Sequence, residues 1–104
     1  MTIDVTRHNG EPVIRFAGKL TIDSVAAAKQ ELVPAVVDAG TAQLDLTAVE
    51  ECDTAGVQLI LMARTDARAH GMAFSARGQS PSFRAAAERV GVPSTIFEDS
   101  KPAE

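Results

Sequence analysis

The side chains that could do chemistry in this sequence gather in residues 50–56. Glu50, Glu51 and Asp53, with Asp45 a little earlier, offer carboxylates that could transfer protons or hold a magnesium ion. No catalytic side chain of another type stands beside them, so we favour a helix N-cap for Asp53 and solvated side chains for the glutamates. We therefore predict that the chain is not an enzyme, and that it has no metal site and no cofactor.

Cys52 and Thr54 flank Asp53 and add two further candidates. A helix N-terminus lowers the pKa of a thiol, but a cysteine in such a position is more often a small buried hydrophobe. Thr54 places a hydroxyl at the start of a strongly apolar helix, where free N–H groups and the helix dipole favour an anion. A phosphate there would add nearly two negative charges beside Asp53. Thr54 is therefore either a switch residue or an ordinary helix-start residue.

Other residue types exclude several kinds of site. His8 and His70 have no metal-binding or catalytic neighbours at a suitable spacing, and His70 is expected near a helix C-terminus. The 7 glycines are scattered along the chain and form no phosphate-binding loop. A single cysteine excludes an internal disulfide and a cysteine-based zinc site. Nucleotide hydrolysis is therefore not expected.

Length and composition describe one small acidic domain. The chain has 104 residues, a net charge of −4 and a pI near 5.1. This balance argues against a surface for nucleic acid or for anionic membranes, because both require clustered positive charge. No signal peptide or membrane-spanning run is visible, so we expect a cytoplasmic protein. Residues 1–98 are expected to form one domain and residues 99–104 a polar tail.

The first part of the chain predicts a hairpin followed by a helix. Asn9-Gly10 is a strong turn signal before a second strand at residues 12–17, which Gly18 should end. The helix is expected to begin at Thr21 or Asp23 and to run to about residue 38.

An internal proline complicates that helix. Pro34 lacks the N–H that a helix interior needs, so a kink or a break is expected near Ala35.

The rest of the chain alternates strands with helices. A strand at residues 43–47 leads to a helix at 57–70, a strand at 72–76 leads to a helix capped by Ser80, and residues 92–97 suggest a short last strand. Helical connections of this length favour parallel pairing. We therefore predict an α/β domain with a mixed sheet of four or five strands, the first antiparallel, and about three or four helices mostly on one face.

Three segments of this chain resemble the STAS domain, the fold shared by anti-sigma-factor antagonists, sulfate-transporter tails and several bacterial signalling proteins. They are Phe-Ala-Gly-Lys-Leu at residues 16–20, Leu-Asp-Leu-Thr-Ala-Val at 44–49 and Asp-Thr-Ala-Gly-Val-Gln-Leu at 53–59. The third is similar to the family signature of Asp, a hydroxyl residue, a small residue, Gly and a hydrophobic residue. The resemblance covers about residues 3–98 and implies the STAS fold.

In the antagonist branch of that family, the residue after the signature Asp is the phosphorylated Ser or Thr, which corresponds to Thr54. The resemblance implies that a Ser/Thr kinase of the anti-sigma type modifies Thr54 and that a phosphatase reverses it. The unmodified domain would bind its protein partner, and the phosphorylated domain would release it. The partner-binding residues implied in this way are Thr21, Asp23, Ser24, Asp53, Thr54, Ala55, Gly56, Val57 and Gln58.

Two positions depart from the antagonist pattern. Thr21 stands where the family often has Asp, and Ala55 stands where antagonists carry a second hydroxyl residue. The sequence also resembles STAS subunits that brace the ATPase of a lipid-transport ABC system, and STAS adaptors of chemotaxis-type histidine-kinase pathways. These alternatives stay open, and the sequence leaves the oligomeric state undetermined.

Overall fold

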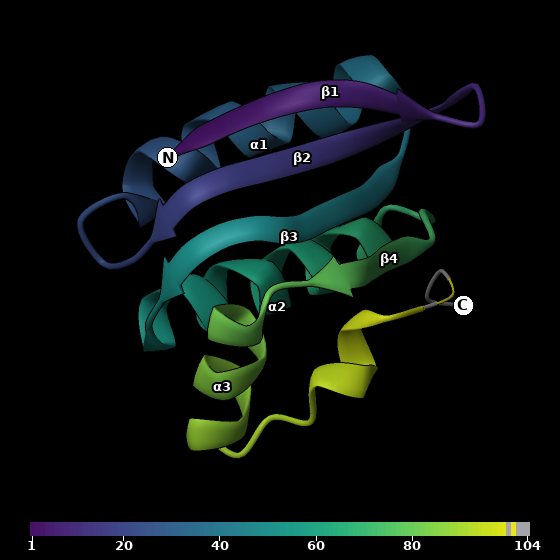
Figure 1. The fold of residues 1–104 in the computed structure, drawn as a ribbon. Coiled ribbons are helices and arrows are strands. Elements are labelled where there is room, and N and C mark those ends of the chain that lie inside the picture. Colours follow the sequence, from purple (N-terminus) through teal and green to yellow (C-terminus); the bar gives the residue numbers. More distant parts are fainter. Residues whose placement is uncertain (100, 102–104) are drawn as a thin grey trace.

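The structure is a computed structural model that describes residues 1–99 and residue 101. Within these residues, four strands, three α-helices and one short 3-10 helix follow one another (Figure 1). In chain order they are β1 (Thr2–His8), β2 (Glu11–Leu20), α1 (Val25–Ala39), β3 (Ala42–Cys52), α2 (Thr54–Ala69), β4 (Phe74–Gln79), α3 (Pro81–Arg89) and the 3-10 helix η1 (Ser94–Phe97).

The described strands form one mixed sheet in the order β1-β2-β3-β4. β1 pairs antiparallel with β2, whereas β2 with β3 and β3 with β4 pair parallel. Asn9 and Gly10 have φ angles of 53° and 82°, the left-handed conformation that a tight hairpin turn requires. The predicted α/β fold, with its mixed sheet and antiparallel first strand, is confirmed.

The two central strands are longer than the sequence indicated. β2 does not end at Gly18 but continues to Leu20, so the expected end of this strand was wrong. Gly18 has a φ of 104° and lies beside a register shift, and it therefore bends the strand without ending it. β3 likewise continues past Thr47 to Cys52. As a result Leu20 and Cys52 are neighbours in the sheet, at the edge where both strands end.

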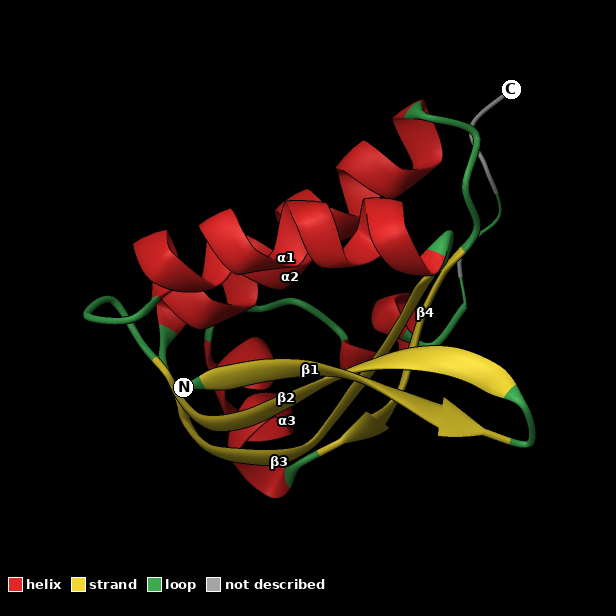
Figure 2. Cartoon of the chain, turned by 90° about the horizontal axis from the view of Figure 1, so that it is seen from above, coloured by secondary structure: helices red, strands yellow, loops and turns green. Residues whose placement is uncertain are grey.

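Helices α1 and α2 lie together on one face of the sheet, as predicted (Figure 2). The core beneath them contains Ile14 and Phe16 of β2, Leu44 and Leu46 of β3, and Ile60 of α2, all nearly inaccessible to solvent. Their alternation along the strands puts the apolar side chains on the helix-covered face. Both helices begin after parallel neighbouring strands, so their N-termini lie at the same edge of the sheet.

Helix α1 corrects the expected N-cap, and it excludes a break, one of the two alternatives expected near Ala35. Its N-cap is Ser24 and not Thr21 or Asp23, and the helix continues from Val25 to Ala39 without a break at Pro34. Pro34 is exposed, so its ring meets solvent and no core side chain has to move. A proline inside a helix costs about 3 kcal/mol, and the burial of the opposite helix face offsets this loss.

The C-terminal part of the fold also differs from expectation. Residues 92–97 do not form a strand, because Pro93 has no N–H to donate to a sheet and the chain turns into η1 instead. Phe97 then points into the core, where its ring lies 5.3 Å from that of Phe83 in an edge-to-face arrangement. Helix α3 begins as predicted, since the Ser80 hydroxyl accepts a hydrogen bond from the Phe83 N–H.

The start of the expected tail is in contact with the domain. Asp99 forms an ion pair with Arg77 of β4, and the Lys101 carbonyl accepts a hydrogen bond from Arg68 Nε at 3.0 Å. The rest of the tail, residues 100 and 102–104, lies outside the described residues.

Candidate partner-binding site

The carboxylate of Asp53 joins the loop before α1 to the first turn of α2. Asp53 is the N-cap of α2, and its Oδ1 accepts a hydrogen bond from the Gly56 N–H at 3.0 Å. Its Oδ2 accepts a second bond from the Ile22 N–H at 2.9 Å. The predicted cap is therefore confirmed. The structure also brings together the two groups of site residues that the sequence predicted, Thr21, Asp23 and Ser24 before α1 and Asp53–Gln58 at the start of α2.

These hydrogen bonds set the ionisation of Asp53. Partial burial opposes the charged form of the carboxylate, but the backbone N–H groups of Ile22 and Gly56 outweigh it and hold the pKa of Asp53 below its usual range. Asp53 is consequently charged throughout the physiological pH range, and it presents a fixed negative charge beside Thr54.

The exposed side chains of the site come from the start of α2. Thr54 is exposed, and its hydroxyl makes no hydrogen bond to any residue that the structure describes. Gln58, one turn later, is also exposed, and Ala55 is half-buried between them. These three residues form a surface that a protein partner can reach.

Two of the sequence-predicted contact residues do not belong to that surface. Val57 is 0% exposed and points into the core, and Gly56 is buried as well. A Cβ at Gly56 would lie 2.3 Å from the backbone oxygen of Leu20 and 2.8 Å from Cys52 Sγ. Gly56 therefore lets the helix start tightly against β2, and it does not serve the close approach of a partner.

The loop before α1 supplies the other half of the surface. The Ser24 hydroxyl donates to the Lys19 carbonyl at 2.7 Å and accepts from the Thr21 N–H at 3.1 Å, so Ser24 shapes the loop and does not face outward. Asp23 is exposed at the tip of the loop, and Thr21 is half-buried.

Ile22 is a site residue that sequence reasoning missed. Its side chain is 68% exposed, a high fraction for a large aliphatic residue, although its backbone is held by Asp53. A shallow hollow beside it is lined by Ile22, Ala55, Gln58 and Met62, among others. The signal in the sequence was an isoleucine between polar loop residues, but nothing in the sequence placed it next to α2.

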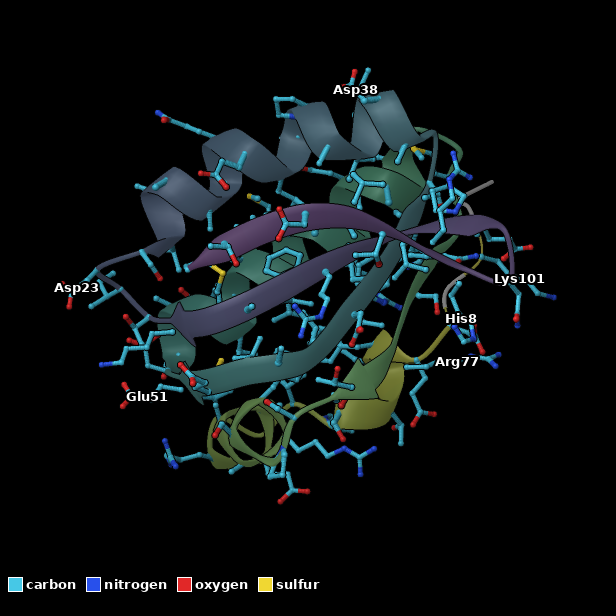
Figure 3. The ribbon with its side chains drawn as sticks, turned by 45° about the horizontal axis from the view of Figure 1, so that its top comes forward. His8, Asp23, Asp38, Glu51, Arg77 and Lys101 are labelled. Atoms are coloured by element: carbon cyan, nitrogen blue, oxygen red, sulfur yellow. The ribbon has the colours of Figure 1, made fainter. Side chains whose placement is uncertain are left out.

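Acidic residues surround this surface. Asp23 and Glu51 both lie at this end of the molecule (Figure 3), and Glu50 is exposed beside Glu51. The backbone carbonyl of Glu50 accepts a hydrogen bond from the Ser82 hydroxyl at 2.7 Å, which connects the end of β3 to α3.

Asp45 does not belong to the acidic cluster in which the sequence placed it. It precedes Glu51 by six residues of β3, about 20 Å along an extended strand. Its Oδ1 accepts hydrogen bonds from the backbone N–H and the hydroxyl of Thr47, at 2.9 and 2.6 Å. Asp45 therefore stabilises the irregular part of β3.

Cys52 fits the interpretation as a small buried hydrophobe. Burial, together with the nearby charge of Asp53, raises the pKa of the Cys52 thiol to about 11. The thiol stays protonated at neutral pH, where only a thiolate would be an effective nucleophile.

The described residues show no arrangement for a metal site, and His70 lies at the end of a helix. These residues contain no cluster of three or more His, Cys, Asp or Glu side chains that could hold a metal ion. His70 lies just after α2, where its Nδ1 is 2.7 Å from the Asp66 carbonyl oxygen, so its expected place near a helix C-terminus is confirmed. No helix in the described part has the length and apolar character to cross a membrane.

The geometry of this site can be set beside what a comparison with protein-family models finds. A family model described as "Mlab, STAS domain" matches residues 3–96. No curated protein matches the chain. The family match covers the sheet, all three α-helices and most of η1, and it includes both halves of the surface around Asp53.

Proposed function

This chain belongs to the STAS-domain family, and we propose that it is a regulatory module that binds a protein partner through the surface formed by Ile22, Thr54 and Gln58. STAS domains are in general regulatory and not catalytic. We further propose that phosphorylation of Thr54 releases the partner, so that a kinase and a phosphatase switch the module between its bound and free forms.

One observation carries the proposal. The side-chain carboxylate at the start of α2, that of Asp53, is engaged by backbone N–H groups, while the adjacent Thr54 hydroxyl is exposed and has no described partner. An exposed hydroxyl at the start of a helix can be reached by a kinase and can also be covered by a partner.

The electrostatics of the surface explain release. A phosphate on Thr54 would sit at the N-terminus of α2, where the helix dipole favours negative charge. It would add almost two negative charges beside Asp53, near Glu50 and Glu51. A partner that binds next to the acidic residues of the unmodified chain would then lose binding free energy, because the phosphate must be desolvated and repels any negative charge on the partner.

Affinity capture with four versions of the tagged chain tests the proposal. The versions are the natural sequence, Thr54→Ala, Thr54→Glu and the control Thr65→Glu, which adds the same charge on an exposed residue of α2 far from the site. The natural chain and the control should capture one partner, Thr54→Ala should capture more of it, and Thr54→Glu should capture little.

Intact-mass analysis of the captured baits completes the test. A species heavier by one phosphate should occur with the natural chain and the control, and it should be absent from Thr54→Ala. Equal capture by all four versions would contradict a role for Thr54 in partner binding. If Thr54→Glu fails to capture the partner but no phosphorylated species is found, the proposed phosphorylation switch is contradicted. The proposed binding surface is then still supported.

A second candidate is a constitutive subunit that braces the ATPase of a lipid-transport ABC system. The matched family carries the description "Mlab, STAS domain", which names neither a sigma factor nor a kinase. This supports a second candidate in which binding to the partner does not depend on phosphorylation. In that case an ABC ATPase should be the captured protein. Thr54→Ala should then weaken capture by removing a contact, and the bait should be unmodified in cells.

A further inference from the structure

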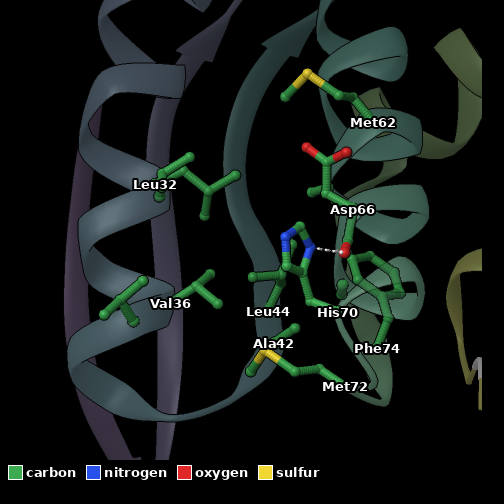
Figure 4. A pocket seen from close by; sticks show the side chains of 13 residues that line it. Leu32, Val36, Ala42, Leu44, Met62, Asp66, His70, Met72 and Phe74 are labelled. Carbon is green, nitrogen blue, oxygen red and sulfur yellow. Dashed lines mark hydrogen bonds between the residues drawn. The ribbon is translucent and has the colours of Figure 1, made fainter. Parts of the chain in front are cut away.

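A second surface lies between α1 and α2, where an open hollow of about 290 Å³ separates the two helices (Figure 4). Leu32 and Val36 of α1 form one wall, and Met62 of α2 stands on the other. Ala42 and Leu44 of β3 form the floor. This hollow is separate from Thr54, which lies at the opposite end of α2.

Small side chains explain why the space is open. Ala42 on the floor and Ala63 and Ala67 on α2 occupy positions where larger residues would close the gap between the helices. At about 30 Å³ per water molecule, the hollow holds roughly ten waters. Most of these waters lie against apolar side chains, which offer them no hydrogen bond. Apolar groups of another molecule would replace this water favourably.

The rim of the hollow exposes large aliphatic side chains. Val33 and Val37 lie one turn apart on α1 and are 53% and 73% exposed. Ile22, at the other end of the same trough, is exposed as well. Such a concentration of exposed aliphatic groups along one groove is typical of a surface that another protein covers.

The length of the trough indicates the shape of its occupant. Met62 lines both this hollow and the shallower one beside Ile22, so the two form one trough along α2. From Ala55 to His70 it follows fifteen residues of α2, about 22 Å at the helical rise per residue. A third helix can lie along a trough of this length between two helices and insert one large side chain per turn.

Two polar side chains at the far end define the charge of the occupant. His70 Nδ1 donates a hydrogen bond to the Asp66 carbonyl oxygen, 2.7 Å away, because a carbonyl oxygen can only accept. The Asp66 carboxylate is an acceptor too. Among the described residues that line this hollow there is no lysine or arginine. A positively charged donor therefore complements this end of the trough.

We propose that the trough between α1 and α2 binds an amphipathic helix of a protein partner, which inserts large apolar side chains into the hollow and places a lysine or arginine beside Asp66 and His70. The inference does not depend on phosphorylation of Thr54. The trough shares Ile22, Ala55 and Gln58 with the surface around Thr54. Its charged end is distinct, because Asp66 is twelve residues from Thr54, about 18 Å along α2, and can be altered without changing that surface.

Three synthetic helical peptides of about four turns, the length of the trough, test this proposal by amide NMR titration of the full chain. The first carries a stripe of leucines and an arginine at its end, the second has glutamate in place of that arginine, and the third has the first composition with the leucines dispersed around the helix. The first should cause saturable shifts around Val37 and Asp66. The second peptide should bind at least about threefold more weakly than the first, and the third peptide should cause no saturable shifts.

Substitutions in the chain make the result specific. Asp66→Lys should reverse the order of the first two peptides, and the control Glu88→Lys, on exposed α3 surface, should not. Val37→Glu should weaken the first peptide at least about fivefold while the circular dichroism spectrum stays unchanged, because this side chain is already mostly in solvent. Equal binding of all three peptides, shifts confined to another face, or no saturable shift would each overturn the proposal.

Discussion

The Asp53 carboxylate accepts hydrogen bonds from two segments that are far apart in the sequence, the loop at Ile22 and the first turn of α2 at Gly56. Each bond alone is an ordinary side-chain contact, worth about 1 kcal/mol. Together they fix the position of the exposed Thr54 relative to the exposed Ile22. Asp53 is thus a positioning residue for both segments.

Replacing Asp53 with asparagine tests this role. The introduced amide can cap α2 through its oxygen, but its NH2 group cannot accept the hydrogen bond from Ile22, so unfolding at pH 7 should become about 1–2 kcal/mol easier. The lowered pKa of Asp53 gives the pH dependence. The natural chain exceeds Asp53→Asn in free energy of unfolding by the full amount above about pH 5. This difference shrinks as the pH falls through the unfolded-state carboxyl pKa of about 4 toward the lower pKa of Asp53 in the folded chain.

Urea unfolding at pH 7 and at pH 3 measures both effects. Amide hydrogen exchange at Ile22 provides a local control, because this amide should exchange faster in the Asp53→Asn variant. A stability difference of the same size at both pH values would show that the charge of Asp53 contributes nothing.

Gly56 supports a second prediction at the same scale. A methyl group at this position would overlap the Leu20 backbone oxygen at 2.3 Å and Cys52 Sγ at 2.8 Å. Gly56→Ala should therefore lower the free energy of unfolding by about 1–3 kcal/mol. Adding Cys52→Ala should restore little of it, because the Leu20 oxygen belongs to the backbone. Thermal unfolding of the two variants and of Cys52→Ala alone decides this, and full rescue by the double variant would contradict it.

Single residues were unevenly predictable from the sequence. The Asp-Thr-Ala-Gly pattern correctly indicated the cap at Asp53, because a cap depends on local geometry. The resemblance placed Val57 among the partner contacts although its side chain is buried, and the exposure of Ile22 was missed. Both depend on how α2 and the loop before α1 pack against the ends of β2 and β3, and local pattern carries no information on that packing.

Among the elements, α1 shows how tertiary packing overrides local propensity. The helix keeps Pro34 in its interior, although proline removes the hydrogen bond to the carbonyl one turn earlier. Leu32, 2% exposed, and Ala28 hold the same helix against the sheet.

Pro34→Ala should therefore stabilise the protein. Alanine restores an N–H donor for the carbonyl of Gln30 and is the best helix former, so the free energy of unfolding should rise by about 1–2 kcal/mol. Chemical denaturation measures the change, with Pro12→Ala in β2 as a control for the general effect of proline on the unfolded chain. A lower stability of Pro34→Ala would show that the ring makes a favourable contact.

The elements with strong local signals were predicted best. Asn9-Gly10 determined the hairpin, and Ser80 with Pro81 determined the start of α3. The last strand was predicted wrongly because residues 92–97 are apolar in a way that suits either a strand or a short buried turn. Pro93 is a local signal against a strand, and the contact of Phe97 with Phe83, which no local pattern indicates, holds the buried turn in place.

For the whole molecule, the topology explains where the candidate site is. Parallel β2 and β3 end at the same edge of the sheet, and this places the loop before α1 beside the start of α2 (Figure 1). The acidic residues Asp23 and Glu51 lie at the same edge (Figure 3). The chain carries a net charge of −4, so one more phosphate increases an existing negative field instead of creating a new one.

The central claim is that a phosphate on Thr54 controls the binding of a protein partner. The most direct measurement is the dissociation constant of the captured partner for the unmodified chain and for the chain phosphorylated on Thr54, with Thr65→Glu as the matched control for added charge on α2. We predict at least about tenfold weaker binding of the phosphorylated chain and no more than about twofold change for the control, since only the first charge lies inside the binding surface. Equal affinity of the phosphorylated and unmodified chains would contradict the account.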